Sequence, residues 1–490
     1  MTTQSPVARR RTKIVATLGP ATTSETQIEA MIQAGMNVAR FNFSHGEAED
    51  HRERARIIRK LEEKLDVHIA ILGDLQGPKI RIARFENQKV MLQQGQEFVL
   101  SNDYPYEKGD AHIVGIDYPE LVTDCRPGDE LLLDDGRIVL EVVRIEGQEV
   151  YTTVLSGGEL SNNKGINRRG GGLSAPSLTE KDKADILLAA EIGVDFIAVS
   201  FPRYGRDMEE ARRLVQEAGS NAWIIAKIER AEAVADDRAL DELIAASDGV
   251  MVARGDLGVE VGDAELVGIQ KKIIGHARTL NKFVITATQM MESMINHPFP
   301  TRAEVSDVAN AVLDYTDAVM LSGESASGLY PVETVKAMAR ICLGAEKHPT
   351  TTQSRHRLGE TFTRFDETIA LAAMYAANHF HQVRAIISLS ESGHTPLIMS
   401  RIRSGVPIYC LTPHDSTRNR VAIFRGVYPV HFDPSAHQDT DVARAAVAQL
   451  LKYQPLDRGD WVLLLQGDHY GVIGATNSMK LLCMDDFLNE

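Results

Sequence analysis

Short apolar segments rich in β-branched residues recur along the first two thirds of the chain and alternate with longer amphipathic segments. The short segments predict buried β-strands, and the period of the longer ones predicts α-helices. Regular alternation of the two is typical of a parallel α/β protein. The eight predicted strands are Thr12–Leu18, Asn37–Ser44, His68–Leu75, Phe196–Phe201, Trp223–Glu229, Gly249–Asp256, Phe283–Gln289 and Ala318–Glu324.

Helical patterns lie between most of these strands. Eight such strand–helix units predict a TIM (β/α)8 barrel, in which the functional residues lie at the carboxyl ends of the strands. The predicted helices include Ser24–Ala34, Glu180–Ile192, Arg206–Ala218, Asp263–Leu280 and Thr301–Leu313.

Two regions depart from this rhythm. Between the third and fourth strands, short alternating segments with turns predict an inserted β domain. After the eighth unit, the polar stretch Lys347–Arg357 predicts a linker to a second α/β pattern. Predicted strands of the insert are Lys89–Leu92, Glu130–Leu133, Ile138–Val143 and Val150–Leu155, and those of the last region are Ala385–Leu389, Pro407–Leu411, Val427–Phe432, Trp461–Gln466 and Ser478–Met484.

Length and charge narrow the possible functions. A chain of 490 residues is long enough for roughly three domains. A net charge of −15 argues against general affinity for nucleic acid, because binding the phosphate backbone requires a basic surface. No apolar stretch reaches the length of a membrane span, and the four cysteines form no closely spaced pair. We therefore expect a cytoplasmic protein without a membrane partner, a zinc site or a disulfide framework.

Charged and polar residues follow the predicted barrel strands at their carboxyl ends. Arg40, Asn42 and Ser44 share one face of the second strand by the two-residue period, and Asp74 ends the third. Such charges are unfavourable unless they meet a partner. They either form a ring of salt bridges or a binding site, and their repetition around the barrel favours a site. The other members are Lys227, Glu229, Asp256, Thr288, Ser322 and Glu324.

Three of these residues have the chemistry of phosphoryl transfer. Glu229 and Asp256 are carboxylates with no thiolate or histidine pair nearby in the sequence, which favours Mg²⁺ or Mn²⁺. If both carboxylates bind the metal ion, the ammonium of Lys227 is free to face an anion. Two unit charges ~4 Å apart interact by roughly 4 kcal/mol at intermediate dielectric. Together with the planar guanidinium of Arg40, these cations suit a phosphoryl group in transfer, and the inserted domain suits a lid.

Several longer motifs resemble the pyruvate kinase family, and the similarity extends over essentially the whole chain. The motifs are Arg11–Pro20 (RTKIVATLGP), Met36–Gly46 (MNVARFNFSHG), Ile225–Arg230 (IAKIER), Met251–Glu260 (MVARGDLGVE), Ile285–Met294 (ITATQMMESM) and Thr301–Asp317 (TRAEVSDVANAVLDYTD). The resemblance implies a catalytic TIM barrel (residues 1–76 and 173–346), an inserted β-barrel lid domain (77–172) and a C-terminal α/β regulatory domain (347–490). It also implies transfer of phosphate from phosphoenolpyruvate to ADP by a magnesium enzyme that is usually a homotetramer.

The resemblance also assigns roles to the residues at the barrel mouth. Lys227 would stabilise the transferring phosphoryl group, and Glu229 and Asp256 would hold Mg²⁺ (or Mn²⁺). Thr288 is the candidate proton donor to the enolate, with Ser322 and Glu324 as a relay, although all three could instead only position the substrate. The resemblance places substrate at Arg40, Lys227, Gly255, Asp256 and Thr288, and the nucleotide at Asn42, His45, Arg81 and Lys164.

One position departs from many members of the family. Asn42, Ser44 and Asp74 match the ligands of a monovalent cation, normally potassium. Lys79 stands where potassium-dependent members have glutamate, as in the potassium-independent branch. We therefore expect that K⁺ is not required, because the ammonium can supply the positive charge of the ion.

In the C-terminal region, the segment from Ser388 to Thr395 ends a predicted strand and precedes a predicted helix, Pro396–Ser404. Hydroxyls, a glycine and a helix start could hold a phosphate, although Glu391 adds an opposing charge. By resemblance this loop binds a phosphorylated allosteric effector, and the chain is most similar to the branch activated by AMP and sugar monophosphates. The expected effector residues are Ser390, Ser392, Gly393, His394 and Thr395.

Two other functions remain open from the sequence. A magnesium-dependent TIM-barrel aldolase or lyase acting on a pyruvate-type enolate also uses paired Glu and Asp, but would not require Lys227, Arg40 and a lid together. A sugar-phosphate sensor without catalytic activity would use only the C-terminal loop, and would not require the mouth residues.

Overall fold

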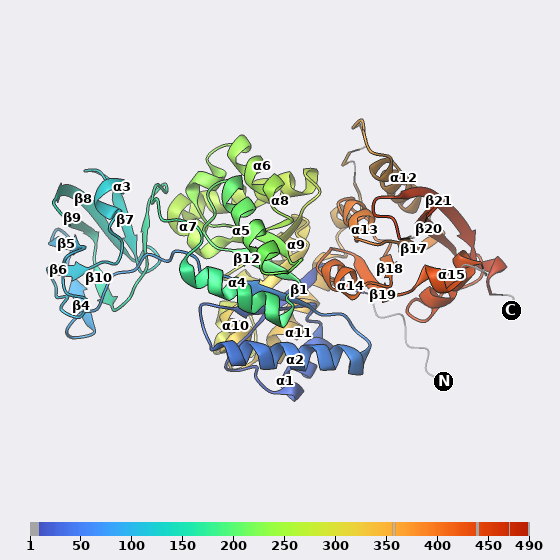
Figure 1. The fold of residues 1–490 in the computed structure, drawn as a ribbon, viewed down its shortest axis with the longest axis horizontal. Helices are drawn as coiled ribbons and strands as arrows, with labels where there is room; N and C mark the ends of the chain where they lie inside the picture. The colour runs from blue at the N-terminus through green and yellow to red at the C-terminus, as the bar shows by residue number, and fades with distance from the viewer. Residues whose placement is uncertain (1–8, 355, 358, 438–440, 470, 489–490) are drawn as a thin grey trace.

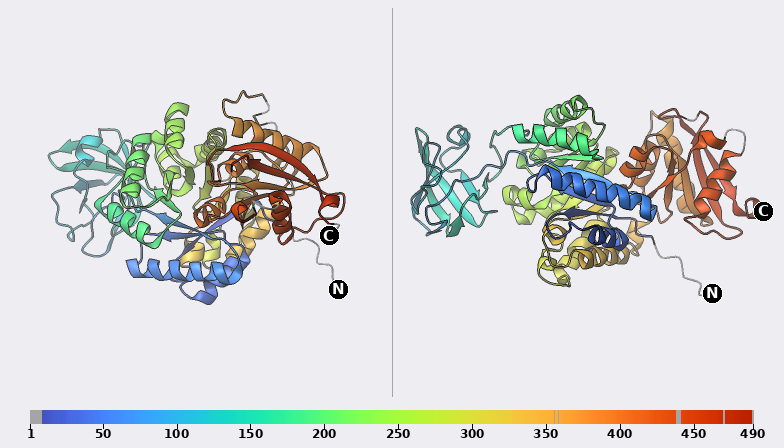
Figure 2. Two further views of the ribbon diagram at one scale, coloured as in Figure 1. Left: turned by 45° about the vertical axis from the view of Figure 1, so that its right-hand side comes forward. Right: turned by 60° about the horizontal axis from the view of Figure 1, so that its bottom comes forward.

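The computed structural model describes residues 9–354, 356–357, 359–437, 441–469 and 471–488. The described chain forms three bodies in a row, with the barrel in the middle, the inserted β domain at one end and the C-terminal α/β domain at the other (Figures 1 and 2). The predicted fold class is thereby confirmed. The residue bounds that we assigned to the three domains remain a prediction.

Eight parallel strands close the central barrel in the order β1-β16-β15-β14-β13-β12-β3-β2. Each predicted strand is present, but the sixth ends three residues early, because helix α7 begins at Arg254. The strands are β1 (Lys13–Leu18), β2 (Val38–Asn42), β3 (Ala70–Asp74), β12 (Phe196–Val199), β13 (Trp223–Ile228), β14 (Gly249–Ala253), β15 (Phe283–Ala287) and β16 (Ala318–Leu321).

Helices surround this barrel, and side-chain caps fix where several of them begin. Ser24 accepts a hydrogen bond from the Gln27 amide at the start of α1, and Thr301 and Glu304 form a capping box at the start of α9. The helices are α1 (Glu25–Ala34), α2 (Ala48–Leu65), α4 (Glu180–Ile192), α5 (Gly205–Glu217), α6 (Asp237–Ala246), α8 (Asp263–Thr279), α9 (Arg302–Leu313) and α11 (Pro331–Ala345), with α7 (Arg254–Val261) and α10 (Gly323–Ala326) at two strand ends.

The inserted domain lies between β3 and α4 and consists of a six-stranded sheet, β11-β7-β8-β9-β5-β6, and a two-stranded sheet, β10-β4. Both sheets enclose one apolar core, to which Leu92 and Leu160 of the smaller sheet contribute. The strands are β4 (Lys89–Leu92), β5 (Glu97–Ser101), β6 (Ile113–Gly115), β7 (Glu130–Leu133), β8 (Ile138–Glu146), β9 (Glu149–Ser156), β10 (Gly158–Ser161) and β11 (Ile166–Arg168), with the short helix α3 (Leu121–Asp124).

The C-terminal domain is built on a five-stranded sheet in the order β19-β18-β17-β20-β21, in which only β21 is antiparallel to its neighbour. All five predicted strands of this region are present. They are β17 (Val383–Leu389), β18 (Ile408–Thr412), β19 (Val427–His431), β20 (Trp461–Gly467) and β21 (Thr476–Cys483), flanked by α12 (Phe365–His379), α13 (His394–Ser400), α14 (Asp415–Val421) and α15 (Val442–Leu451).

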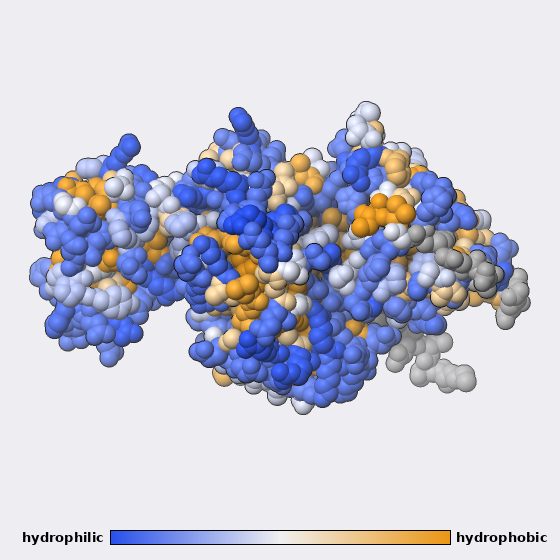
Figure 3. Space-filling model, in the orientation of Figure 1, coloured by the Kyte–Doolittle hydropathy of each residue, from blue (hydrophilic) through white to orange (hydrophobic). Residues whose placement is uncertain are grey.

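Apolar packing joins the barrel to the C-terminal domain at the amino-terminal ends of the barrel strands. Phe424 packs against Phe283 and Trp223, with ring centroids 5.8 and 6.1 Å apart. Hydrophilic residues cover most of the face of the molecule seen in Figure 3. None of the helices in the described ranges is both long enough and apolar enough to cross a bilayer.

Candidate active site

Four charged side chains form a continuous chain at the carboxyl ends of β2, β3 and β13. Arg40 donates from Nε to Asp74 Oδ2 at 2.7 Å, and Lys227 Nζ lies 3.3 Å from Asp74 Oδ1 and 2.9 Å from Glu229 Oε1. Asp74 and Glu229 are each 1% exposed and Arg40 8%. The charges alternate in sign, so each cation offsets the cost of burying its neighbouring anion. The predicted mouth residues therefore do pair with one another.

Polar partners fix both cations of this chain in place. Arg40 Nη1 donates to Thr17 Oγ1 at 2.8 Å, and Lys227 Nζ donates to Ser200 Oγ at 2.7 Å. Ser200 directly follows β12 and was not predicted as a site residue. A serine after an apolar strand carries no distinctive signal, and only the barrel geometry places it beside Lys227.

Burial and neighbouring charge shift the pKa values of the chain. Burial raises the pKa of Glu229 to about 7; Lys227 opposes this rise, and the charge of Asp256 adds to it. Burial also acts against ionisation of Asp74, but Arg40 and Lys227 outweigh it and lower the pKa of Asp74. Burial disfavours the charged form of Lys227, yet Asp74 and Glu229 hold its pKa above the ordinary value. Lys227 is therefore a permanent cation.

Gly255 and Asp256 lie in the first turn of α7, directly after β14. The Gly255 amide donates to Thr288 Oγ1 at 2.8 Å, so the two predicted substrate residues are in contact. Thr288 has φ = 64°, a left-handed conformation that is strained for a β-branched residue. Arg254 Nη2 donates to the Thr288 carbonyl at 2.8 Å, and Arg254 Nη1 pairs with Asp307 of α9 at 2.7 Å. Arg254 thus holds this backbone in position, a role that the sequence did not predict.

Ser322 and Glu324 follow β16 on the other side of the mouth. Glu324 is 3% exposed and accepts from two backbone amides, that of Ser322 at 2.7 Å and that of Met291 at 3.1 Å. Both carboxylate oxygens of Glu324 are therefore used to fix loops. This geometry favours a positioning role over a place in a proton relay.

Two cavities open beside the charged chain. The first measures about 620 Å³ and lies between the barrel and the inserted domain, with Asp135 and Arg169 on one side and Gly255 and Asp256 on the other. The second measures about 530 Å³ and is lined by residues that follow β1, β2 and β16. The chain begins with Arg40 at the second cavity, and the charge of Asp256, which lines the first cavity, acts on Glu229 at its other end.

The second cavity receives two of the predicted nucleotide residues, Asn42 and His45. The Asn42 carbonyl oxygen accepts from the Ser44 amide at 3.1 Å, which closes the turn after β2. Arg81 and Lys164 lie instead in the inserted domain, where Lys164 pairs with Asp134 at 2.6 Å and Arg81 is exposed.

Lys79 lines the first cavity, whereas Asn42 lines the second. Asp74 is paired with Arg40 and Lys227 instead. The structure thus places Lys79 on the Asp256 side of the mouth.

The two carboxylates Glu229 and Asp256 fit a hard divalent cation. Their mutual repulsion raises the pKa of Glu229 beyond the effect of burial, and a bound cation would relieve it. Within the described residues no three His, Cys, Asp or Glu side chains gather into a metal cage. Two protein carboxylates with the remaining positions open to substrate and water are the ligand set expected for Mg²⁺.

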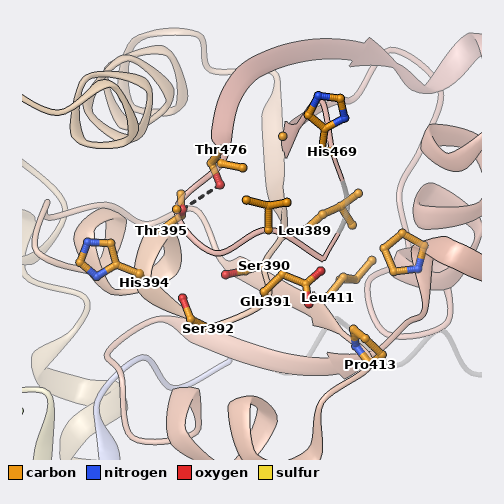
Figure 4. A pocket seen from close by; sticks show the side chains of 15 residues that line it. Leu389, Ser390, Glu391, Ser392, His394, Thr395, Leu411, Pro413, His469 and Thr476 are labelled. Carbon is orange, nitrogen blue, oxygen red and sulfur yellow. Dashed lines mark hydrogen bonds between the residues drawn. The ribbon is translucent and has the colours of Figure 1, made fainter.

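Four of the five predicted effector residues line a separate cavity in the C-terminal domain, namely Ser390, Ser392, His394 and Thr395 but not Gly393 (Figure 4). The Thr395 hydroxyl donates to Thr476 Oγ1 at 3.0 Å. The ring of His394 points away from Ser390 and Glu391 and lies 3.8 Å from Asp366. Helix α13 begins at His394, two residues before the predicted start, so Thr395 lies in its first turn.

Glu391 lines this cavity, but both of its carboxylate oxygens have protein partners. Its carboxylate contacts His414 Nε2 at 2.6 Å and accepts from the Gly471 amide at 3.0 Å. The cavity measures about 30 Å³, space for little more than a water molecule. A phosphorylated ligand would therefore have to displace lining residues such as Gly467, His469 and Val472.

The fold and the mouth together define the class of protein, a TIM-barrel enzyme with an inserted lid domain and a buried, alternating set of charges between two cavities. The family model for the barrel domain of pyruvate kinase matches residues 9–335, and the model for its alpha/beta domain matches residues 367–482. The chain belongs to the pyruvate kinase family, whose members are phosphotransferases that use phosphoenolpyruvate, ADP and a divalent metal.

Individual relatives support this assignment over nearly the full length. Pyruvate kinase II of Salmonella typhimurium is 58% identical over 476 residues, which cover 97% of this chain and 99% of the relative. A pyruvate kinase of Haemophilus influenzae is 57% identical over 469 residues, or 96% and 97% of the two chains. A crystal structure of a pyruvate kinase from Cryptosporidium parvum superposes with a TM-score of 0.90 at 32% identity. The superposition covers 97% of this chain and 96% of the Cryptosporidium chain.

Proposed function

We propose that this chain transfers the phosphoryl group of phosphoenolpyruvate to ADP at the barrel mouth, giving pyruvate and ATP. The observation that carries this proposal is the buried chain from Arg40 through Asp74 and Lys227 to Glu229. Arg40 lines the second cavity, and Asp256 of the first cavity acts on Glu229 by its charge. Phosphoenolpyruvate would bind in the cavity of Gly255 and Asp256, and ADP in that of Asn42 and His45. A phosphoryl group passing between them would meet Lys227.

Lys227 stabilises the charge on the phosphoryl group in this proposal. Because its ammonium is buried and hydrogen-bonded to Ser200, no solvent reorganisation is needed when that charge develops. Arg40 binds phosphate oxygens from the ADP side, with its guanidinium oriented by Asp74 and Thr17. Glu229 and Asp256 would hold Mg²⁺, which supplies further charge neutralisation when bound.

Thr288 is the proposed proton donor to the enolate. Its hydroxyl donates to the Ala287 carbonyl, with the two oxygens 2.7 Å apart, and rotation about the Cβ–Oγ1 bond would redirect the hydroxyl hydrogen toward the first cavity. The enolate carbon takes this proton to form pyruvate, and the threonine recovers one from solvent. Replacing Thr288 by Ala should slow exchange of the pyruvate methyl hydrogens in D₂O. Unchanged exchange would leave Thr288 only a positioning role.

Independence from potassium is supported by the pairing of Asp74. Two cations already contact its two carboxylate oxygens, which leaves little need for a third. The ammonium of Lys79 adds positive charge on the side of the first cavity. Rates in Tris and sodium salts should therefore match those in potassium salts, and a large stimulation by potassium would contradict this proposal.

Allosteric control by a phosphorylated metabolite is proposed at the loop from Ser390 to Thr395. The hydroxyl residues Ser390, Ser392, Thr395 and Thr476 line its cavity. Both carboxylate oxygens of Glu391 have protein partners. We expect AMP and sugar monophosphates to raise the melting temperature and fructose 1,6-bisphosphate to have little effect. Thr395→Val should remove that response without changing the unstimulated rate. A cytoplasmic homotetramer is the assembly proposed from the family resemblance.

The function is tested with an assay in which lactate dehydrogenase reports pyruvate formed from phosphoenolpyruvate and ADP. We expect turnover that requires all of phosphoenolpyruvate, ADP and Mg²⁺. Pyruvate release without ADP, from a substrate with a carbon–carbon bond, would support an aldolase or lyase. Ligand binding without any turnover would support a sensor.

A further inference from the structure

The second cavity is lined by a positively charged side chain, that of Arg54, to which the proposed reaction gives no role. Arg54, in the second turn of α2, is 7% exposed and lines this cavity together with Arg40 and His45. Its Nε has no hydrogen-bond partner among the described residues. Buried guanidinium groups are normally paired, so an incompletely satisfied one at a cavity wall points to a ligand.

The surroundings of Arg54 do not satisfy it. Burial lowers its pKa, and Asp50, one helical turn earlier, opposes that effect. The Asp50 carboxylate is already used to cap α2, where Oδ2 accepts from the Glu47 amide at 3.0 Å. His51, the other titratable neighbour, has its own pKa lowered by burial and by the charge of Arg54. Arg54 therefore faces the cavity with only one partial counter-charge beside it.

The position of Arg54 along the cavity indicates which part of a nucleotide it would meet. Arg40 marks the inner end, because Asp74 connects it to Lys227. The transferring phosphate must lie at that end. Arg54 comes from a separate element, the helix α2, next to the Gly46 turn, where its Nη1 would lie 3.8 Å from a Cβ on Gly46. A nucleotide whose phosphates reach Arg40 would direct its nucleoside toward Arg54.

We propose that Arg54 recognises the nucleoside end of ADP, with its guanidinium plane packed against the base. Planar guanidinium groups stack on aromatic rings in a way that a lysine ammonium does not. The inference rests on the proposed function, because it takes the second cavity as the nucleotide site. Arg54 is a specificity residue in this proposal, and it does not contact the reacting atoms.

The test compares Arg54→Ala and Arg54→Lys with Arg56→Ala. Arg56 lies on the same helix but is exposed and pairs with Glu53, so it controls for loss of helix charge. We expect KM for ADP to rise about tenfold in both Arg54 variants, the range of one lost stacking contact, with KM for phosphoenolpyruvate and kcat nearly unchanged. The Arg56 variant should behave as wild type.

Inhibition by inorganic pyrophosphate shows whether Arg54 contacts the nucleoside or the phosphates of ADP. Pyrophosphate has no base, so its inhibition constant should be the same for wild type and Arg54→Ala. If Arg54→Ala lost affinity for pyrophosphate and for ADP equally, Arg54 would contact the phosphates, and the proposal would be overturned. An unchanged KM for ADP would overturn it as well.

Calorimetric titration of ADP distinguishes failure of this inference from failure of the proposed function. If wild type forms no pyruvate, the reaction is wrong, but weaker ADP binding by Arg54→Ala would still support nucleotide recognition. If Arg54→Ala fails to fold, Arg54→Lys provides the same comparison. Equal ADP affinity in folded wild type and Arg54→Lys would overturn the role of the guanidinium plane.

Discussion

The two ends of the barrel each bury a set of charged residues, but the two sets are completed differently. At the carboxyl ends, the chain from Arg40 to Glu229 lies between two cavities. At the amino-terminal ends, Arg401 pairs with Asp317, and both side chains are 0% exposed. Arg40 of the first set, called here the upper set, lines a cavity that a ligand can fill. The second, the lower set, lies between the barrel and the C-terminal domain.

Protein atoms satisfy the pair of Arg401 and Asp317, in which all three guanidinium nitrogens and both carboxylate oxygens have partners. Asp317 accepts from the Val284 and Arg425 amides, each at 2.9 Å, in addition to Arg401. Arg401 also donates to the Lys282 carbonyl at 2.7 Å. Since Arg401 and Arg425 belong to the C-terminal domain, and the other residues to the barrel, the lower set holds the two domains together.

The difference between the two sets distinguishes charges that are buried to stabilise the fold from charges that are buried to serve the reaction. In the lower set, removal of one partner leaves an ion that no water can reach. In the upper set, Glu229 already has its pKa near neutrality, so it can take up a proton when its partner is lost. We therefore expect changes at the mouth to affect turnover, and changes at the lower end to affect stability.

The largest expected effect is that of Lys227→Met on turnover. Loss of the ammonium that pairs with both Asp74 and Glu229 should lower kcat by about 10³-fold or more, the range seen when a preorganised transition-state donor is removed. The melting temperature should change little, because Arg40 still pairs with Asp74 and Glu229 can become neutral. Coupled assays and thermal unfolding measure the two quantities. A variant within tenfold of wild type would contradict the assigned role.

The next effect is on stability, and it belongs to the lower set. Arg401→Met leaves Asp317 buried without its counter-ion, which should reduce the free energy of unfolding by about 3–5 kcal/mol. KM for both substrates should remain near wild type in the folded fraction. Urea denaturation measures the loss. Arg213→Met is the matched control, because Arg213 is exposed and water screens its ion pairs, so its loss should change stability little. Similar losses in both variants would reject the distinction.

A third effect follows from the raised pKa of Glu229. In the folded protein the Glu229 carboxyl group keeps its proton up to about pH 7, whereas in the unfolded protein it releases the proton near pH 4.5. The resulting stability is present below the unfolded value and is lost as the pH rises through 7. With EDTA present, wild type should lose about 2 kcal/mol relative to Glu229→Gln between pH 5 and 8.

Magnesium should reverse that trend, since the ion requires the ionised carboxylate. Its stabilisation of wild type should be greater at pH 8 than at pH 6 and should be absent in Glu229→Gln. The thermal shift on adding MgCl₂ measures this, and an equal shift at both pH values would count against Glu229 as a ligand.

The sequence predicted the mouth better than the lower end, for a physical reason. Strand period and motif spacing place Lys227, Glu229 and Thr288 at strand ends, which a closed barrel must bring together. Arg401 and Asp317 are 84 residues apart, in different domains, and no local pattern relates them. Arg54 was missed because its incomplete hydrogen bonding exists only in the folded protein.

The smallest expected effect concerns backbone strain at the mouth. Gln289, the residue after Thr288, has φ = 51°, a left-handed conformation that glycine adopts freely. Gln289→Gly should relieve strain that Gln289→Ala retains, so the glycine variant should be more stable than the alanine variant by about 1 kcal/mol. Because both variants lack the same side chain, their difference in urea denaturation isolates the backbone term. If the alanine variant is equally stable, the mouth holds no strain at this position, and the contrast with the lower end is one of charge alone.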